Sequence, residues 1–234
     1  MEYKITKYSE LLSTNTKAAE LGEFSHLECI VAERQTSGRG RMGRSFYSEG
    51  GGLYMSVLLD PSRVKCTLPL VTFAAAVSLR EALASLGFEV GIKWVNDILY
   101  SGKKAAGILT EAKTKNGEIE RIIVGIGVNL ISPEGGFPDE IKNKATAIGY
   151  MGDKDVLIKL ILSGLCENLS RNSDELMELY RKNMLMIGKV AEVSDYRSGE
   201  KKTVKILGVD NDGSLVCEDE EGNALCLVSG EVLY

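Results

Sequence analysis

The segment from Arg34 to Gly52 constrains this chain most, because glycine and arginine alternate through it. Its centre is Gly38-Arg39-Gly40-Arg41-Met42-Gly43-Arg44. Glycine lacks a Cβ atom and lowers the cost of unusual backbone angles, so neither a regular helix nor a regular strand is expected here. Arginine carries a guanidinium fork that matches carboxylates and phosphates. Since apolar strands are expected on both sides, the segment predicts a flexible loop that closes over an anion. The alternative is an ordinary solvated basic loop.

The rest of the chain is acidic and typical of a globular protein. It has 234 residues, a net charge of −5 and 44% hydrophobic residues. These values fit one main core with a small second domain and argue against general nucleic-acid binding. No apolar stretch reaches the roughly 18 residues of a membrane span, and the N-terminus has no apolar signal region. We therefore expect a cytoplasmic protein without a membrane partner.

Histidine and cysteine usage excludes several kinds of site. The one histidine, His26, nearly excludes Ser-His-Asp catalysis and multi-histidine metal sites, so we expect a structural or surface role for it. The cysteines are odd in number, scattered and without a Cys-x-x-Cys spacing. We expect buried thiols of a reducing compartment rather than a disulfide or zinc framework. The cysteines are Cys29, Cys66, Cys166, Cys217 and Cys226.

Hydrophobic periodicity predicts an α+β fold, with a mixed sheet and flanking helices. Strands are expected at 3–8, 27–33, 53–59, 88–92, 98–100, 105–112 and 118–130. A short helix is expected from a cap at Ser13 or Thr14 to Gly22, a second one over 68–86, and a third after Asp153. Core positions of the third and of a following helix are Val156, Leu157, Leu160, Ile161, Leu165, Leu176, Leu179 and Tyr180.

The pattern changes after Met184. Short strands separated by turns at 211–213 and 221–223 predict a small β-barrel of roughly 45–50 residues. We therefore expect two domains, a catalytic one over 1–185 and a C-terminal SH3-like barrel over 186–234. In the larger domain, Asn116-Gly117 predicts a hairpin. Gly125 and Gly127 in its second strand indicate either a close approach to the backbone or a β-bulge.

Charged and amide side chains gather at expected strand ends and loops: the loop arginines, Asn96, Asp97, Lys103, Lys104 and Asn129. They include no evident nucleophile–base pair. Fixed cations suit a reaction whose difficulty is charge, such as bringing a carboxylate up to a triphosphate. Neither a P-loop nor a Rossmann glycine motif is present.

Six segments, in this order and spacing, resemble the biotin–protein ligases, also called biotin–[acetyl-CoA-carboxylase] ligases. They are Ser13-Thr14-Asn15, the 38–44 segment, Leu53-Tyr54-Met55-Ser56, Lys93-Trp94-Val95-Asn96-Asp97, Lys104-Ala105-Ala106-Gly107-Ile108-Leu109 and Gly125-Ile126-Gly127-Val128-Asn129. The resemblance covers nearly the whole chain. It implies that biotin and ATP with Mg²⁺ give biotinyl-5′-adenylate, and that the acyl group passes to a lysine of a biotin carboxyl carrier domain. It also implies a homodimer.

The same resemblance implies roles for individual residues. Biotin would contact Ser13, Thr14, Asn15, Gln35, Gly38, Arg39, Gly40, Arg41, Lys104, Gly107, Gly125 and Gly127. ATP would contact Arg41, Phe46, Asn96, Asp97 and Asn129, with Mg²⁺ held mainly by phosphates and close to Asp97. Lys104 and Arg41 would be catalytic, since Lys104, not Lys103, stands three residues before Gly107. Because the loop is rich in glycine and lacks apolar anchors between Gln35 and Ser45, we expect a lid that is mobile without ligand and ordered with the adenylate.

Three positions depart from the family pattern. Met42 replaces a basic or polar residue, Phe46 replaces a tryptophan, and Val95 replaces a proline. The alternatives are a lipoate–protein ligase or octanoyltransferase of the same fold, and an inactive biotin-binding module. A biotin-responsive repressor would need a DNA-binding segment ahead of the catalytic region, which begins near Met1 here. We therefore expect a monofunctional ligase without specific DNA binding.

Overall fold

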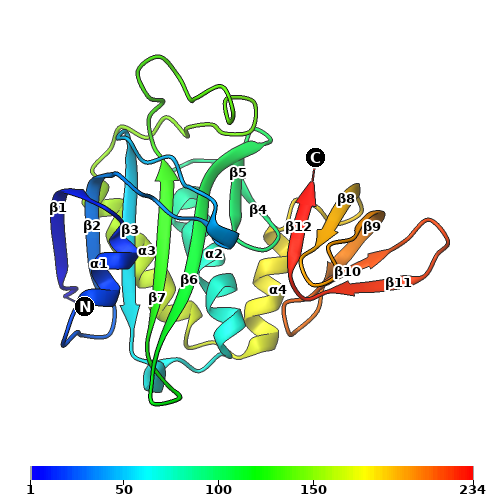
Figure 1. Ribbon diagram of the computed structural model, residues 1–234, viewed down its shortest axis with the longest axis horizontal. Helices are drawn as coiled ribbons and strands as arrows, with labels where there is room; N and C mark the ends of the chain where they lie inside the picture. The colour runs from blue at the N-terminus through cyan, green and yellow to red at the C-terminus, as the bar shows by residue number, and fades with distance from the viewer. Residues whose placement is uncertain (1, 234) are drawn as a thin grey trace.

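The computed structural model describes residues 2–233 and contains two sheets, with four helices packed around the larger one (Figure 1). The larger sheet has seven strands in the order β1-β2-β3-β7-β6-β5-β4. β1 and β2 run parallel, and every other neighbouring pair is antiparallel. The strands are β1 Ile5–Leu11, β2 Glu28–Gln35, β3 Gly52–Leu59, β4 Val90–Lys93, β5 Asp97–Tyr100, β6 Lys103–Lys115 and β7 Glu118–Asn129. This is the mixed sheet with flanking helices that the sequence predicted.

Different helices pack on the two faces of this sheet. α2 (Leu68–Ser85) and α3 (Lys154–Asn168) cover one face, and α4 (Ser173–Asn183) packs beside α2. The short α1 (Thr14–Glu20) lies on the other face, over β2, β3 and β7. β3 serves both, because Leu53, Met55 and Val57 face the main core while Leu58 packs beneath α1. The α1 face is left open over part of its length, and the Gly/Arg segment crosses it (Figure 1).

Local signals explain where several elements begin and end. The hydroxyl of Ser13 accepts a hydrogen bond from the Thr16 amide and so caps α1. α2 has a proline in its first turn, where the missing N–H costs nothing. Asn116 and Gly117 both have positive φ angles, 54° and 84°, as a two-residue type I′ hairpin requires. α2 is long and apolar enough to cross a membrane, but most of it is buried in the core.

The C-terminal strands form a second, antiparallel sheet in the order β11-β10-β9-β8-β12. They are β8 Val190–Asp195, β9 Lys201–Val209, β10 Leu215–Glu218, β11 Ala224–Leu227 and β12 Gly230–Leu233. β11 and β12 do not pair with each other in the described residues, so the small barrel expected here is open at that seam. Its buried side chains join the core of the larger sheet, and the Trp94 indole donates to the Gly213 carbonyl at 3.0 Å. The two sheets are therefore fixed to each other.

Three details differ from the expectations. Val156 is 46% exposed on α3 and not in the core, because Ile158 and Leu162 complete the buried face of the helix. Cys226 is exposed and Cys166 half-buried, so only three of the free thiols are buried. Cys226 pairs with Val216 on the outer face of its sheet, whereas Cys217 points inward. β1 runs from Ile5 to Leu11 instead of over residues 3–8.

The structural role expected for His26 is confirmed. Its Nδ1 accepts a hydrogen bond from the Asp60 backbone N–H at 3.1 Å. Burial lowers the pKa of the imidazole, which favours the neutral form that can accept this bond.

The core assignment of α3 can be tested with two substitutions on one helix. Ile161→Ala should lower the free energy of unfolding by about 2–5 kcal/mol, because Ile161 is fully buried. Val156→Ala should change it by roughly 0.5 kcal/mol or less, because that side chain is exposed. Urea titration followed by circular dichroism measures both, and similar losses for the two variants would contradict the packing described.

Candidate active site

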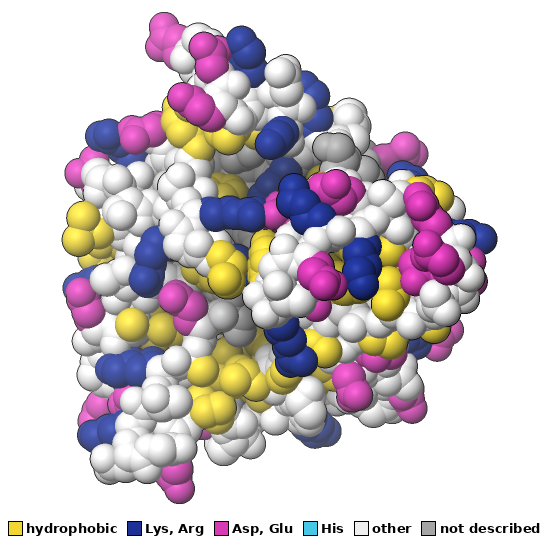
Figure 2. Space-filling model, turned by 45° about the vertical axis from the view of Figure 1, so that its right-hand side comes forward, with side chains coloured by type: hydrophobic (Ala, Val, Ile, Leu, Met, Phe, Trp, Pro, Cys, Tyr) yellow, Lys and Arg dark blue, Asp and Glu magenta, His cyan; other side chains and the backbone are white. Residues whose placement is uncertain are grey.

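The open part of the α1 face contains a cavity of about 120 Å³. Its walls come from α1, the Gly/Arg segment, the connection between β4 and β5, the first half of β6, the second half of β7, and the C-terminal sheet with the turn after β8. Figure 2 shows Lys and Arg side chains gathered beside a hollow in this face. The two ends of the cavity differ in chemistry.

One end is polar and carries no net charge among its closest side chains. Ser13, Thr14 and Asn15 lie at the start of α1, and Gln35 ends β2. The Thr14 N–H donates to Gln35 Oε1 at 2.8 Å, and the Ser56 hydroxyl donates to Asn15 Oδ1 at 2.5 Å. All five side chains are nearly buried, at 8% exposure or less. Such groups can recognise a small neutral head that both donates and accepts hydrogen bonds.

The glycines of β7 make this end of the cavity possible. A Cβ atom at Gly125 would collide with the Asn15 amide, and one at Gly127 would lie 2.6 Å from the Phe46 ring. The pairing of β7 with β3 and β6 is regular through both positions, so a bulge is excluded there. Of the two alternatives that the sequence left open, the structure shows the close approach. The approaching groups are the side chains of Asn15 and Phe46.

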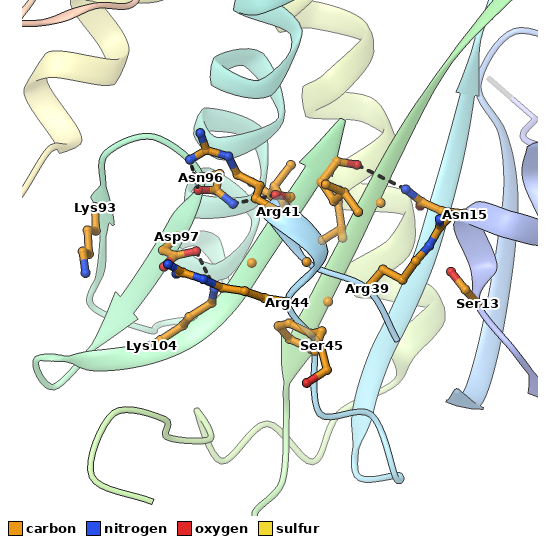
Figure 3. A pocket seen from close by; sticks show the side chains of 18 of the residues that line it. Ser13, Asn15, Arg39, Arg41, Arg44, Ser45, Lys93, Asn96, Asp97 and Lys104 are labelled. Carbon is orange, nitrogen blue, oxygen red and sulfur yellow. Dashed lines mark hydrogen bonds and ion pairs between the residues drawn. The ribbon is translucent and has the colours of Figure 1, made fainter. Parts of the chain in front are cut away.

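The other end of the cavity is cationic. Arg41, Arg44, Lys93 and Lys104 all line it, together with Asp97 and Glu231. Lys104 Nζ lies 2.6 Å from Asp97 Oδ1, and Arg41 donates to Asn96 Oδ1 at 3.3 Å. Figure 3 shows Lys104, Arg44 and Asp97 converging on one region, with Arg41 and Asn96 above it. A polyanion would meet preorganised donors here without displacing apolar groups.

Burial and neighbouring charges perturb two groups at this end. Burial lowers the pKa of Lys93, and the charges of Lys104 and Arg44 lower it further, although Asp97 and Glu231 act in the opposite sense. The hydrogen bond from Arg44 lowers the pKa of Glu231. Glu231 therefore stays ionised and offsets part of the positive charge at neutral pH.

The Gly/Arg segment has its own internal contacts. The Gly40 N–H donates to the Arg44 carbonyl at 2.7 Å, and the Phe46 N–H donates to the Gly38 carbonyl at 2.9 Å. Met42 points outward with 70% exposure and a φ angle of 53°, so this departure from the family pattern lies away from the cavity. The mobility of the Gly/Arg segment without ligand stays a prediction.

Of the other two departures, Phe46 lines the cavity, whereas Val95 packs against the main core beside it. The Phe46 ring lies over Gly107 and Gly127 and meets the Tyr54 ring edge-on, with centroids 6.4 Å apart. The Val95 carbonyl accepts a hydrogen bond from the Tyr180 hydroxyl at 3.1 Å, and the Trp94–Val95 peptide bond is cis.

Most residues selected from the sequence line the cavity: Ser13, Thr14, Asn15, Gln35, Arg39, Gly40, Arg41, Phe46, Asn96, Asp97, Lys104, Gly107, Gly125 and Gly127. Gly38 and Asn129 do not. A Cβ atom at Gly38 would collide with Ser48, and the Asn129 amide donates to the Thr146 carbonyl at 3.1 Å. The structure thus brings these two residues close to the site but outside its wall.

The sequence did not reveal every residue of the site. Ser56 was present in a matched segment but received no role, although its hydroxyl bonds with α1. Arg44 forms a two-bond ion pair with Glu231, at 2.7 and 2.5 Å. Tyr196, whose ring lies beneath the Arg41 guanidinium, also comes from the C-terminal sheet. Nothing in the sequence pattern places Glu231 or Tyr196 there.

Comparisons with known proteins agree with this geometry. Residues 9–129 match the model of the biotin/lipoate A/B protein ligase family. The bifunctional ligase/repressor BirA of Bacillus subtilis (strain 168) is 34% identical over 233 residues, which cover 92% of this chain and 70% of that protein. The biotin–[acetyl-CoA-carboxylase] ligase of Paracoccus denitrificans is 35% identical over 131 residues, 54% of this chain and 53% of that enzyme.

A solved structure extends the likeness to both sheets. The biotin protein ligase from Aquifex aeolicus, in complex with biotin and ATP, superposes with a TM-score of 0.84 and 30% identity. The match covers 98% of this chain and 97% of that one. With the fold, the divided cavity and the matched sequence in agreement, the chain belongs to the biotin/lipoate A/B protein ligase family.

Proposed function

We propose that this chain is an ATP-dependent biotin–protein ligase, which activates biotin as biotinyl-5′-adenylate and transfers it to a lysine of a carboxylase carrier protein. The observation that carries the proposal is the division of one cavity into a neutral polar end and an end with four cationic side chains. An acid with a neutral head and a carboxylate tail fits this division, if its carboxylate points at the cations. The Aquifex aeolicus enzyme, similar over both sheets, holds biotin and ATP.

The polar end favours biotin over lipoate. Thr14, Asn15 and Gln35 offer hydrogen-bond donors and acceptors in an almost closed space. The ureido group of biotin can add hydrogen bonds to these groups, whereas the dithiolane ring of lipoate has no N–H or C=O group to offer them. Each hydrogen bond that a buried polar group loses costs roughly 1–3 kcal/mol, so the preference for biotin should be large.

In the first step, a carboxylate oxygen of biotin attacks the α-phosphorus of ATP, and the bond to pyrophosphate breaks. We assign to Lys104 the bridge between the carboxylate and the α-phosphate, which is supported by the position of its ammonium group against Gly107 and 2.6 Å from Asp97 Oδ1. The Arg41 guanidinium would exchange its hydrogen bond to Asn96 for contacts with the phosphates. Both groups reduce the repulsion between two anions and stabilise the charge of the transition state.

Mg²⁺ fits this end of the cavity. Asp97 and Asn96 supply oxygen atoms of the kind Mg²⁺ prefers, and the ion takes most of its ligands from phosphates and water in such sites. The described residues contain no cluster of three or more acidic, histidine or cysteine side chains that could hold a metal alone. The ion, when bound with ATP, would neutralise the charge that leaves with pyrophosphate.

In the second step, the amine of the acceptor lysine attacks the acyl carbon of the adenylate and AMP leaves. The C-terminal sheet, which we take as a domain beginning at residue 186, borders the cationic end through Glu231 and Tyr196. We infer that this border helps hold the nucleotide and the acceptor.

Exchange of ³²P between pyrophosphate and ATP tests the first step directly. The purified chain should catalyse exchange with biotin and at least about 100-fold more slowly with lipoate, because the buried polar groups discriminate between the two heads. Exchange with lipoate alone would refute the assignment. Biotin binding without any exchange would favour a non-catalytic module.

The role of Lys104 can be separated from that of its neighbour. Lys104→Ala should lower kcat for exchange by about 100- to 1,000-fold, the usual cost of losing one preorganised donor. Lys103→Ala is the matched control, since the Lys103 ammonium is directed to the Lys142 carbonyl outside the cavity. Full adenylation activity in Lys104→Ala would contradict the proposed role.

The Arg44–Glu231 ion pair should make the stability pH-dependent. The pKa of Glu231 lies below its ordinary value of 4.5 in the folded protein, so the pair stabilises the fold above that pH and is lost as the pH falls through the lowered pKa. Arg44 is 56% and Glu231 27% exposed, so Glu231→Gln should cost roughly 1 kcal/mol or less at pH 7. Urea titrations from pH 7 to 3 should show the two proteins converging, and a difference that grows on acidification would contradict this.

A further inference from the structure

Glu111 belongs to none of the site residues considered so far, yet it connects two of them. It lies on β6, two residues after Leu109 and four after Gly107, and so on the same face of the strand. Its Oε2 atom accepts a hydrogen bond from Asn15 Nδ2 at 2.6 Å and lies 3.5 Å from Arg39 Nη2. One carboxylate oxygen thus joins the start of α1 to the Gly/Arg segment.

An ionised carboxylate can only accept hydrogen bonds, and this fixes the orientation of Asn15. The Asn15 amide must turn its NH₂ group to Glu111, where it also contacts the Leu109 carbonyl at 3.4 Å. Its oxygen then faces Ser56, which donates to it at 2.5 Å. Without the charge of Glu111, only the longer contact with the Leu109 carbonyl would favour this orientation over the reversed amide.

The orientation of the Asn15 amide in turn determines how the Ser56 hydroxyl bonds. Ser56 Oγ has one proton, so when it donates to Asn15 Oδ1 it cannot also donate to Thr14 Oγ1, 2.7 Å away. The Thr14 hydroxyl must then be a donor, either to Ser56 Oγ or to Gln35 Oε1 at 3.1 Å. Gln35 Oε1 is satisfied independently by the Thr14 N–H. A charged residue at the edge of the sheet therefore sets the donors and acceptors that the neutral end of the cavity presents.

Arg39 forms the second branch of this arrangement. Its Nη2 atom donates to Thr16 Oγ1 at 3.2 Å and faces Glu111. Figure 3 shows the Arg39 side chain reaching toward Asn15. Arg39 is 47% and Glu111 36% exposed, and ion pairs this exposed are weak. A ligand carboxylate in the cavity can therefore take Arg39 from Glu111.

We propose that Glu111 is a positioning residue for the acid ligand. It fixes the hydrogen-bond direction of Asn15, and it holds Arg39 beside α1 until the carboxylate of the ligand takes the place of Glu111. The inference rests on the proposed function. Glu111 does not touch the reacting atoms, so its effect should fall on the binding of the acid and not on the chemical step.

Glu111→Gln keeps the shape of the side chain and removes its charge. Its KM for biotin in the exchange reaction should rise about tenfold, as when one charge-assisted hydrogen bond is replaced by a neutral one. The kcat value should stay within about twofold, because the interaction is equal in the ground and transition states. Glu118→Gln, on the same hairpin and exposed, is the matched control and should leave both constants unchanged.

A double-mutant cycle distinguishes positioning from a general loss of stability. In an Asn15→Ala background, Glu111→Gln should raise KM by about threefold or less, because its main route of action is gone. Glu111→Asp, which retains the charge but withdraws it by one methylene, should also raise KM and leave kcat unchanged. Glu111→Asp takes the place of Glu111→Gln in this test if the Glu111→Gln variant does not fold.

Three results would overturn the inference: an unchanged KM in Glu111→Gln, a loss confined to kcat, or the same tenfold effect in the Asn15→Ala background. If the unmodified chain shows no biotin-dependent exchange, the proposed function fails instead. The wild-type assay therefore separates the two failures.

Discussion

The close contact between side chains and the backbone of β7 is the constraint on which the site depends. Gly125 and Gly127 remove two Cβ atoms from the centre of a regular sheet, and Asn15 and Phe46 occupy the space. Any side chain at Gly125 would push α1 away from the sheet. The Thr14–Gln35 and Asn15–Ser56 hydrogen bonds would then be broken, although none of these residues is adjacent to Gly125 in sequence. The missing Cβ atom of Gly125 thus fixes the distance between α1 and the sheet, and with it the width of the neutral end, while that of Gly127 makes room for Phe46.

The cationic end obeys a different rule, since like charges must be kept together before the substrate arrives. Asp97 and Glu231 provide this by pairing with Lys104 and Arg44. These are partly exposed pairs, so they neutralise charge without locking it in place. A phosphate group can replace either carboxylate as a partner with little reorganisation. The neutral end, in contrast, is buried and held together by hydrogen bonds. This suits the head of the ligand, which is not altered in the reaction.

The sequence predicted the fold class and nearly every strand, because these depend on local signals, whereas most of the cavity wall was predicted from the resemblance to the biotin–protein ligases. Periodicity, caps and turn glycines act over a few residues, and a motif such as the 104–109 segment places its residues on one strand. The failures concern long-range packing. The exposure of Val156 depends on how α3 is rotated against its neighbours, and the presence of Glu231 and Tyr196 depends on how the second sheet docks. Neither is encoded in the spacing of nearby residues. Gly38 and Asn129 show that a residue can belong to a matched motif without lining the cavity. They contact residues outside the cavity wall instead.

The Arg44–Glu231 pair connects positions 187 residues apart, and β12 is the last described strand along the chain. During synthesis, the loop, α1 and the seven-stranded sheet all leave the ribosome well before β12. The nascent chain can therefore complete the neutral end of its cavity while the cationic end still lacks a wall. Domains fold as units and in order during synthesis. Competence for nucleotide chemistry is then a late event in the life of each molecule, set by the arrival of β12.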